Sequence, residues 1–425
     1  MAINLPNGLL KLLDIDPSTI EVSLSNAGNI FSGTDANEHI LGNGGGDVID
    51  AKGGSDIVEG GTGGDTLVGG GGNVYVEGGA GGDAMNGGAG IDTLGHSQSG
   101  SSVKVTLNDS GDGTTSGSGS GPGNHAQGDT IGGFENVVGS LFNDTLTGNN
   151  SANVLAGLAG ADKLFGMGGN DILIGGVGAD DELVGGDEGD TIHGGAGNDT
   201  ILGGNGIDHL FGDDGDDFID VGFSDEGNTQ TATGGSGADT LVCSGDGAAK
   251  YSSSPDAIDV NQTSNVFLGG DAEGDSVTGF SGIVGSNFDD TIKGFSDVDG
   301  GGGNDQIYAL NQADVVGGRE LKGGDGTDTF YFTTFLADDD YTITDYDYAS
   351  GEKIDLSAID ADPDALEDQA FVWDSGESSS PGTISQREDE DGIVLTLNVG
   401  DQQVSIVLQD YFNDGEPLPA DAFIL

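Results

Sequence analysis

The sequence predicts an all-β fold, a parallel β-roll (β-solenoid) of stacked turns that ends in a C-terminal β cap. A nine-residue pattern, G-G-x-G-x-D-x-U-x with U a large apolar residue, repeats in register along much of the 425-residue chain. One such unit is too short to bury its own apolar face, so the units must stack on one another. The chain also holds 85 glycines and only 6% aromatic residues, which suits a thin, elongated core better than a conventional globular one.

Residues 1–32 are predicted to be an N-terminal capping segment. Residues 19–24 alternate as TIEVSL, a strand that covers the first open edge of the stack. The start of the chain lacks a basic region, and Lys11 and Asp14 break its apolar stretch. No apolar run reaches 18 residues, so we expect neither a transmembrane helix nor a cleaved signal peptide.

The first block of repeats spans residues 33–95 in seven consecutive units. Position eight of each unit, the U position, is apolar and is expected to form the core. Position six holds an aspartate in five units: Asp47, Asp56, Asp65, Asp83 and Asp92. Glu38 and Val74 occupy position six in the other two units, which we expect to bind metal weakly or not at all.

An insert over residues 96–138 separates the first block from a second block at residues 139–220. The second block is the longest run, with nine units and one inserted residue near Asp180. Asn153 is its single departure at position six. The other eight units carry Asp144, Asp162, Asp171, Asp181, Asp190, Asp199, Asp208 and Asp217 there.

A third, interrupted block covers residues 221–331, and residues 332–425 are predicted to be a C-terminal β cap with a secretion signal. The block holds four scattered units, with Asp239, Asp290, Asp305 and Asp328 at position six. Its interruption from Gly270 matches the earlier segment from Asn124 almost position for position, so a larger module has been duplicated. In the cap, residues 393–399 and 404–408 alternate in hydrophobicity and predict a hairpin.

The repeated aspartates and glycines together point to calcium. Calcium takes six to eight oxygen ligands, and paired glycines allow a turn that aims backbone carbonyls at one spot beside a carboxylate. If units i and i+2 stack in parallel, each ion can lie between two stacked turns. All seventeen position-six aspartates named above are therefore predicted calcium ligands. A metal-free turn-forming aspartate is the alternative for any single unit, but it does not explain the long runs in fixed phase.

The repeats resemble those of the RTX, or haemolysin-type, calcium-binding proteins, over roughly residues 33–331. Residues 352–373 also resemble the C-terminal portion of serralysin-type secreted peptidases, and the final ADAFIL is similar to the ends of type I secretion substrates. The resemblance implies export through type I secretion machinery without a cleaved leader. It also implies folding on contact with extracellular calcium, and a location outside the cell or on its surface.

Charge and motif content narrow the function. With 74 acidic and 10 basic residues the formal net charge is −64, which argues against nucleic acid and anionic membrane as partners. Cys243 is the single cysteine, so no intrachain disulfide braces the fold. The five histidines contain no H-E-x-x-H pair, and G-x-S-x-G is absent, so we predict no enzymatic activity.

Two functional hypotheses remain from the sequence. The first is a structural, surface or adhesion protein whose partner is the cell surface or an extracellular polysaccharide. The second is a non-catalytic or divergent member of a secreted enzyme family, either a serralysin-like peptidase or a polysaccharide-modifying enzyme.

Overall fold

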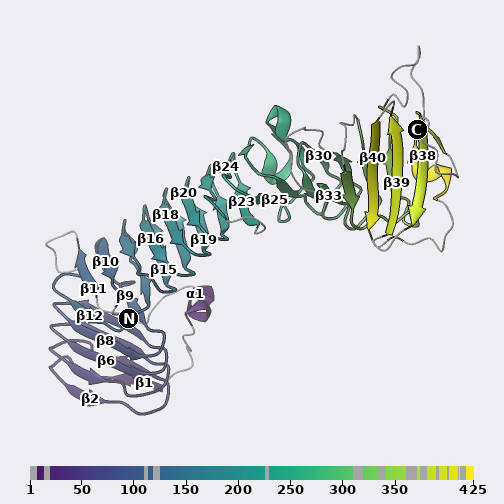
Figure 1. The fold of residues 1–425 in the computed structure, drawn as a ribbon. Coiled ribbons are helices and arrows are strands. Elements are labelled where there is room, and N and C mark those ends of the chain that lie inside the picture. The colour runs from purple at the N-terminus through teal and green to yellow at the C-terminus, as the bar shows by residue number, and fades with distance from the viewer. Residues whose placement is uncertain are drawn as a thin grey trace. The chain divides into compact units, whose positions relative to one another are not determined.

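The regular secondary structure of the described residues consists almost entirely of short strands, which confirms the predicted all-β class (Figure 1). The computed structural model describes residues 7–13, 20–109, 113–117, 125–224, 229–309, 319–333, 340–359, 371–373, 381–388, 392–399, 402–409, 411 and 418–425. Internal contacts divide the chain into two compact units, Met1–Thr231 and Ala232–Leu425. The finer six-part division predicted from the sequence remains a prediction.

In the first unit, successive nonapeptides alternate between two parallel sheets. One sheet contains β1 (Ile20–Ser23), β3 (Glu38–Leu41), β5 (Ile57–Thr62), β7 (Tyr75–Ala80), β9 (Thr93–Gly95), β13 (Asn136–Val138), β15 (Val154–Gly160), β17 (Ile172–Gly178), β19 (Thr191–Ala196) and β21 (His209–Asp214). The other contains β2 (Ile30–Ser32), β4 (Val48–Asp50), β6 (Thr66–Gly71), β8 (Ala84–Ala89), β12 (Thr130–Gly132), β14 (Thr145–Thr147), β16 (Lys163–Gly168), β18 (Glu182–Asp187), β20 (Thr200–Asn205) and β22 (Phe218–Asp220). We call each nonapeptide turn a rung.

The register of the strands places the apolar residue of every unit in one core. Ile49 pairs with Leu67 and Leu67 with Met85, so paired residues lie two nonapeptides apart. In the second block Leu173 pairs with Ile192, one residue further, because of the inserted residue. The position-eight side chains of both blocks are buried, as the repeat pattern predicts.

The insert between the blocks continues the stack. Strand β12 pairs with β8, and β13 pairs with β9, both in parallel. A hairpin of β10 (Val103–Leu107) and β11 (Gly113–Gly117) then lies in the sheet between β12 and β14. The turns on either side of the insert are therefore joined through hydrogen-bonded strands.

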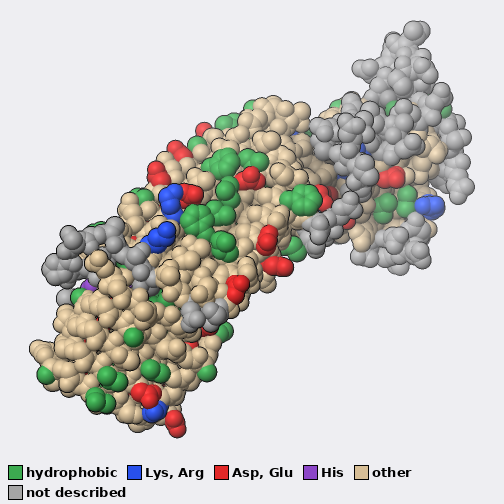
Figure 2. All heavy atoms as spheres, turned by 60° about the vertical axis from the view of Figure 1, so that its left-hand side comes forward, with side chains coloured by type: hydrophobic (Ala, Val, Ile, Leu, Met, Phe, Trp, Pro, Cys, Tyr) green, Lys and Arg blue, Asp and Glu red, His purple; other side chains and the backbone are tan. Residues whose placement is uncertain are grey.

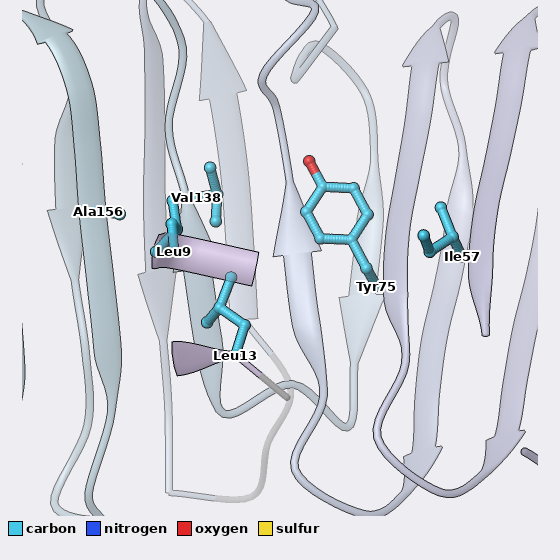
Figure 3. Close-up of a cluster of buried hydrophobic side chains, with 6 residues drawn as sticks. All are labelled: Leu9, Leu13, Ile57, Tyr75, Val138 and Ala156. Atoms are coloured by element: carbon cyan, nitrogen blue, oxygen red, sulfur yellow. The ribbon is translucent and has the colours of Figure 1, made fainter. Parts of the chain in front are cut away.

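A short helix, α1 (Asn7–Leu12), packs on the outer face of one sheet and was not predicted from the sequence. Leu9 and the following Leu13 are buried against Tyr75, Val138 and Ala156 (Figure 3). Tyr75 occupies an outward position of its rung and has no exposed surface. The helix therefore belongs to an apolar cluster on the outside of the stack, separate from the inner core.

The second unit has the same construction with shorter strands. One ladder contains β25 (Gly247–Lys250), β29 (Gly282–Val284), β31 (Asp297–Asp299), β33 (Arg319–Lys322) and β35 (Asp340–Ile343). A second contains β27 (Val266–Leu268), β26 (Asp259–Asn261), β30 (Thr291–Lys293), β32 (Gln306–Tyr308), β34 (Thr329–Tyr331), β36 (Lys353–Asp355) and β41 (Phe423–Ile424). Strand β24 (Thr240–Val242) pairs with β28 (Ser276–Thr278), and β23 (Gln230–Ser236) contains the boundary between the units.

The C-terminal part of the second unit forms an antiparallel sheet, as the alternating pattern predicts. Strand β39 (Gly392–Val399) pairs with β38 (Thr383–Glu388) and β40 (Gln402–Gln409), and β37 (Val372–Trp373) joins at the edge. Strand β40 pairs with β35 and so attaches this sheet to the stack. Three short 3-10 helices, η1 (Gln262–Ser264), η2 (Gly270–Ala272) and η3 (Ala420–Ala422), complete the described elements.

Candidate metal centre

The position-six aspartates lie in columns that run along the turns. In one column the backbone N–H of Asp162 donates to Asp181 Oδ1 over 2.6 Å, and the N–H of Asp181 donates to Asp199 Oδ1 over 2.7 Å. In the column on the other wall, the N–H of Asp171 donates to Asp190 Oδ1 over 2.8 Å. All seventeen predicted aspartates are buried, with at most 4% of their surface exposed. The structure thus brings these residues together as neighbours within columns.

The second carboxylate oxygen of most of these aspartates has no hydrogen-bond partner. Buried polar atoms are nearly always paired in native proteins, so each such oxygen calls for an unseen partner. The oxygens concerned are the Oδ2 atoms of Asp47, Asp56, Asp65, Asp83, Asp92, Asp162, Asp171, Asp190, Asp199, Asp208, Asp305 and Asp328.

In most of these rungs a backbone carbonyl of the next stacked turn faces the same place as the unpaired carboxylate oxygen. A Cβ atom added to Gly194 would lie 2.5 Å from Asp199 Oδ2 and 2.8 Å from the carbonyl oxygen of Gly212. At Gly203 the same two distances, to Asp208 Oδ2 and the Val221 carbonyl, are 2.5 and 2.7 Å. Glycine at position one leaves room for the converging oxygens, and Ala51, in the rung of Asp56, is the exception. A carboxylate and carbonyl oxygens are the donor set that calcium prefers, so the residues fit a calcium ion.

The second glycine of each pair has a backbone conformation that most residues avoid. Gly195 and Gly204 have φ angles of +106° and +116°. Met167 takes the same place with φ of +83°, in the left-handed region that is unfavourable for residues with a Cβ. The repeat therefore accepts local strain to keep the turn in this conformation.

Burial raises the pKa of the column carboxyls far above the usual value for aspartate. It raises the pKa of Asp162, Asp171, Asp181 and Asp190 to about 7, and that of Asp305 to about 8. The neighbouring N–H donor lowers each pKa, but by less than burial raises it. A bound cation would reverse this preference because it favours the ionised form.

The structure adds three acidic residues that the repeat pattern did not identify as position-six equivalents. Asp83 N–H donates to Asp129 Oδ1, and Asp239 N–H donates to Asp275 Oδ1, each over 2.8 Å. Asp92 N–H donates to Glu135 Oε2, also over 2.8 Å. Asp129 and Asp275 lie at matching places in the duplicated segments, each followed two residues later by an apolar residue. That shared D-x-U spacing was the available signal.

The three position-six residues that are not aspartate, Glu38, Val74 and Asn153, also lie in the columns. Val74 supplies no carboxylate, although its N–H still donates to Asp92 Oδ1. Glu38 and Asn153 accept hydrogen bonds from their own turns, through Thr34 and Asn149. Across the ranges that the structure describes, no three His, Cys, Asp or Glu side chains form an ion site by themselves.

Replacing Gly166 by alanine is expected to destabilise the first unit by about 1–3 kcal/mol and to weaken calcium binding at its rung. The added Cβ would overlap Asp171 Oδ2 and lie 2.6 Å from the Gly185 carbonyl oxygen. Urea unfolding in saturating calcium measures the change. Gly168→Ala in the same rung is the matched control, because its Cβ would meet nothing closer than 3.6 Å. Equal losses in both variants would contradict the proposed oxygen cradle.

Comparison with known families agrees with the geometry. The model for the RTX calcium-binding nonapeptide repeat (4 copies) matches residues 32–67, 59–94, 129–157, 147–182, 176–210, 194–225 and 294–319. These repeats are calcium-binding motifs and occur in both units, which supports calcium binding at multiple sites. A comparison with curated proteins finds no match. The chain therefore carries RTX calcium-binding nonapeptide repeats in both of its units.

Proposed function

We propose that this protein is secreted, folds on binding extracellular calcium, and serves as a structural or adhesive component at the cell surface or in the extracellular matrix. The observation that carries the proposal is the column of buried carboxylates, most of which have an unpaired oxygen, with a carbonyl of the next turn beside it in most of those rungs. We assign the position-six aspartates with unpaired oxygens as ligands, together with carbonyls of the glycine turns.

Each part of the repeat has its own role in this proposal. The position-one glycine leaves space for the ion, and the N–H of the preceding aspartate fixes Oδ1 so that Oδ2 faces that space. When bound, calcium would neutralise the facing carboxylates and join successive turns through shared oxygen ligands. The apolar position-eight residues then align the strands beneath the turns.

The charge of the chain supports a fold that depends on calcium. The formal net charge is −64, and Figure 2 shows few basic side chains among the acidic ones on the face in view. Without bound cations, the facing carboxylates in each column repel one another or must take up protons. Such a chain would stay unfolded where calcium is scarce, a state that suits export.

The packing of the C-terminal end is consistent with recognition before folding. Phe423 is buried, and β41 pairs with β36 in the folded unit. If residues 420–425 act as the export signal, the machinery would bind them before this strand forms. No helix in the described ranges is both long and apolar enough to cross a membrane.

A second candidate function is a non-catalytic or divergent member of a secreted enzyme family. Residues 352–373 favour it, because they resemble the C-terminal portion of serralysin-type peptidases. Turnover of casein or of an alginate-like polysaccharide by the pure calcium-loaded protein would support this candidate over the structural one.

Fractionation of the source culture tests the favoured function. We expect the protein outside the cells, retained on the cell or matrix fraction in calcium, and released by a calcium chelator. A chelator preloaded with calcium is the control and should release nothing. Protein found only inside cells, or retention unchanged by the chelator, would contradict the proposal.

A further inference from the structure

The turns of the stack are of two kinds, which differ at position two of the nonapeptide. In most rungs position two has a positive φ angle, as at Lys52, Gly61 and Gly195, and the carboxylate Oδ2 of the same rung has no partner. We call these open rungs. In four rungs position two is Thr34, Ser140, Asn149 or Ser286, and none of these four residues has a positive φ. We call these capped rungs.

In every capped rung the backbone N–H of position two donates to the side-chain oxygen of position six. Ser286 N–H donates to Asp290 Oδ2 over 2.6 Å, and Ser286 Oγ donates to Asp290 Oδ1 over 2.7 Å. Ser140 N–H and Oγ make the same pair of bonds to Asp144. The cap therefore occupies both carboxylate oxygens.

Two of the three rungs without an aspartate follow the same rule, and the third, with Val74, has Gly70 with a φ of +105° at position two and no cap. Thr34 N–H donates to Glu38 Oε2 over 3.0 Å and Thr34 Oγ1 donates to Glu38 Oε1 over 2.9 Å. Asn149 N–H donates to Asn153 Oδ1 over 2.7 Å. The cap is therefore found where position two is Thr, Ser or Asn with a negative φ angle, whether position six is Asp, Glu or Asn.

The carbonyl of the next turn is present in both kinds of rung. A Cβ at Gly139, in a capped rung, would lie 3.0 Å from the Gly157 carbonyl oxygen, and one at Gly203, in an open rung, 2.7 Å from that of Val221. The two kinds of rung therefore share this oxygen, and all of them except the Lys52 rung, which has Ala51, share the glycine at position one. They differ at the carboxylate Oδ2, which accepts an N–H from position two in capped rungs and has no hydrogen-bond donor in open rungs.

An N–H donor and a cation compete for the same carboxylate oxygen. The N–H carries partial positive charge and satisfies the lone pairs that a calcium ion would use, and its hydrogen occupies the place of the ion. Opening a capped rung would require the loss of two hydrogen bonds to a buried carboxylate. Glycine at position two removes the hydroxyl and permits the positive φ that turns the N–H away.

Capped rungs stand at the start of the first two blocks and directly after the interruption in the third. The rung at Gly33 opens the first block, and that at Gly285 follows the interruption in the third. In the second block the first two rungs, at Gly139 and Gly148, are both capped. These two rungs belong to opposite walls, since β14 and β15 lie in different sheets, so each wall of this block begins with a capped turn.

Resting on the proposed calcium ligands, we propose that the residue at position two decides which rungs bind calcium. Rungs with Thr34, Ser140, Asn149 or Ser286 are closed to calcium and satisfy their acidic or amide side chains internally. Rungs with a positive φ at position two and an aspartate at position six are the calcium sites. Asp144 and Asp290 are then structural residues, although they match the repeat motif at position six.

Native mass spectrometry of the full chain in calcium, which counts bound ions, tests the proposal through Asn153. Asn153→Asp restores the motif aspartate but keeps the Asn149 cap, so the ion count should stay at the wild-type value. Asn149→Gly combined with Asn153→Asp should add one ion. A gain with Asn153→Asp alone, or no gain with the folded double variant, would overturn the proposal.

A second rung provides an independent test. Ser140→Gly should add one ion, whereas Ser140→Ala, which keeps the backbone N–H cap, should add none. Circular dichroism confirms that each variant is folded. If the wild-type protein binds no calcium at all, the proposed calcium sites fail. If it binds calcium but Ser140→Gly adds no ion, or Ser140→Ala adds one, the calcium sites stand and only the proposed role of position two fails.

Discussion

Removing calcium with excess chelator at neutral pH is expected to unfold most of the repeat stack. Extracellular calcium modules bind with dissociation constants of roughly 0.1–1 mM. At free calcium about tenfold above that value, each site adds about 1.4 kcal/mol, so on the order of ten sites add about 14 kcal/mol. This is as large as the whole stability of an ordinary domain, about 5–15 kcal/mol. Loss of the far-UV circular dichroism signal of β structure measures the effect.

Magnesium provides the control for this experiment. It requires near-octahedral geometry with short metal–oxygen distances and releases its bound water reluctantly, so carbonyl-rich turns suit it poorly. Readdition of calcium should restore the β signal, and the same concentration of magnesium should not. Full β signal in excess chelator would show that the apolar core and hydrogen bonds suffice without the ion.

Acidification is expected to raise the free energy of unfolding of the calcium-free protein and to lower that of the calcium-loaded protein. Burial raises the folded-state pKa of Asp162 and Asp190 to about 7, against about 3.9 in an unfolded chain. Between these values the folded form binds more protons than the unfolded form. The free energy of unfolding without calcium is therefore highest below about pH 4 and falls as the pH rises through about 7.

With calcium bound, the ionised carboxylates are the ligands, so protonation competes with the ion. Stability should then fall as the pH drops from 7.5 to 5. Without calcium, two buried groups act against the aspartates on acidification. Burial lowers the pKa of His96 to about 4, and although burial raises the pKa of Glu77, hydrogen bonds from its neighbours lower it below its usual value. The aspartates with raised pKa outnumber these two groups. Far-UV circular dichroism of the chelated protein at pH 5 and 7.5, and urea unfolding of the calcium-loaded protein at the same two pH values, measure the two slopes. Slopes of the same sign would contradict the assignment of these carboxylates as ligands.

The fixed nine-residue spacing of the apolar and aspartate positions made the stack and its columns of aspartates predictable from the sequence. Leu173 and Ile192 hold position eight of their rungs, and both lie in the core because a fixed period forces a fixed register. The same period placed Asp171 and Asp190 in one column. The alternation in residues 393–399 and 404–408 likewise predicted the hairpin of β39 and β40.

Other features depend on contacts that no short pattern encodes. The packing of α1 arises because Tyr75, at an outward position, leaves an apolar surface that Leu9 and Leu13 cover. Asp129 reaches its column only because β12 pairs with β8, 46 residues earlier in the chain. The cap at Asp144 follows from the backbone conformation of Ser140, and the motif at position six looks the same in open and capped rungs.

The central claim, that calcium ions in the aspartate columns hold the fold together, is tested most directly by urea unfolding at a series of free calcium concentrations. If folding takes up many ions, the free energy of unfolding should rise by about 1.4 kcal/mol per ion for each tenfold increase in calcium above the dissociation constant. We expect a total rise of several kcal/mol per decade. A free energy of unfolding that does not change with calcium concentration would contradict the claim.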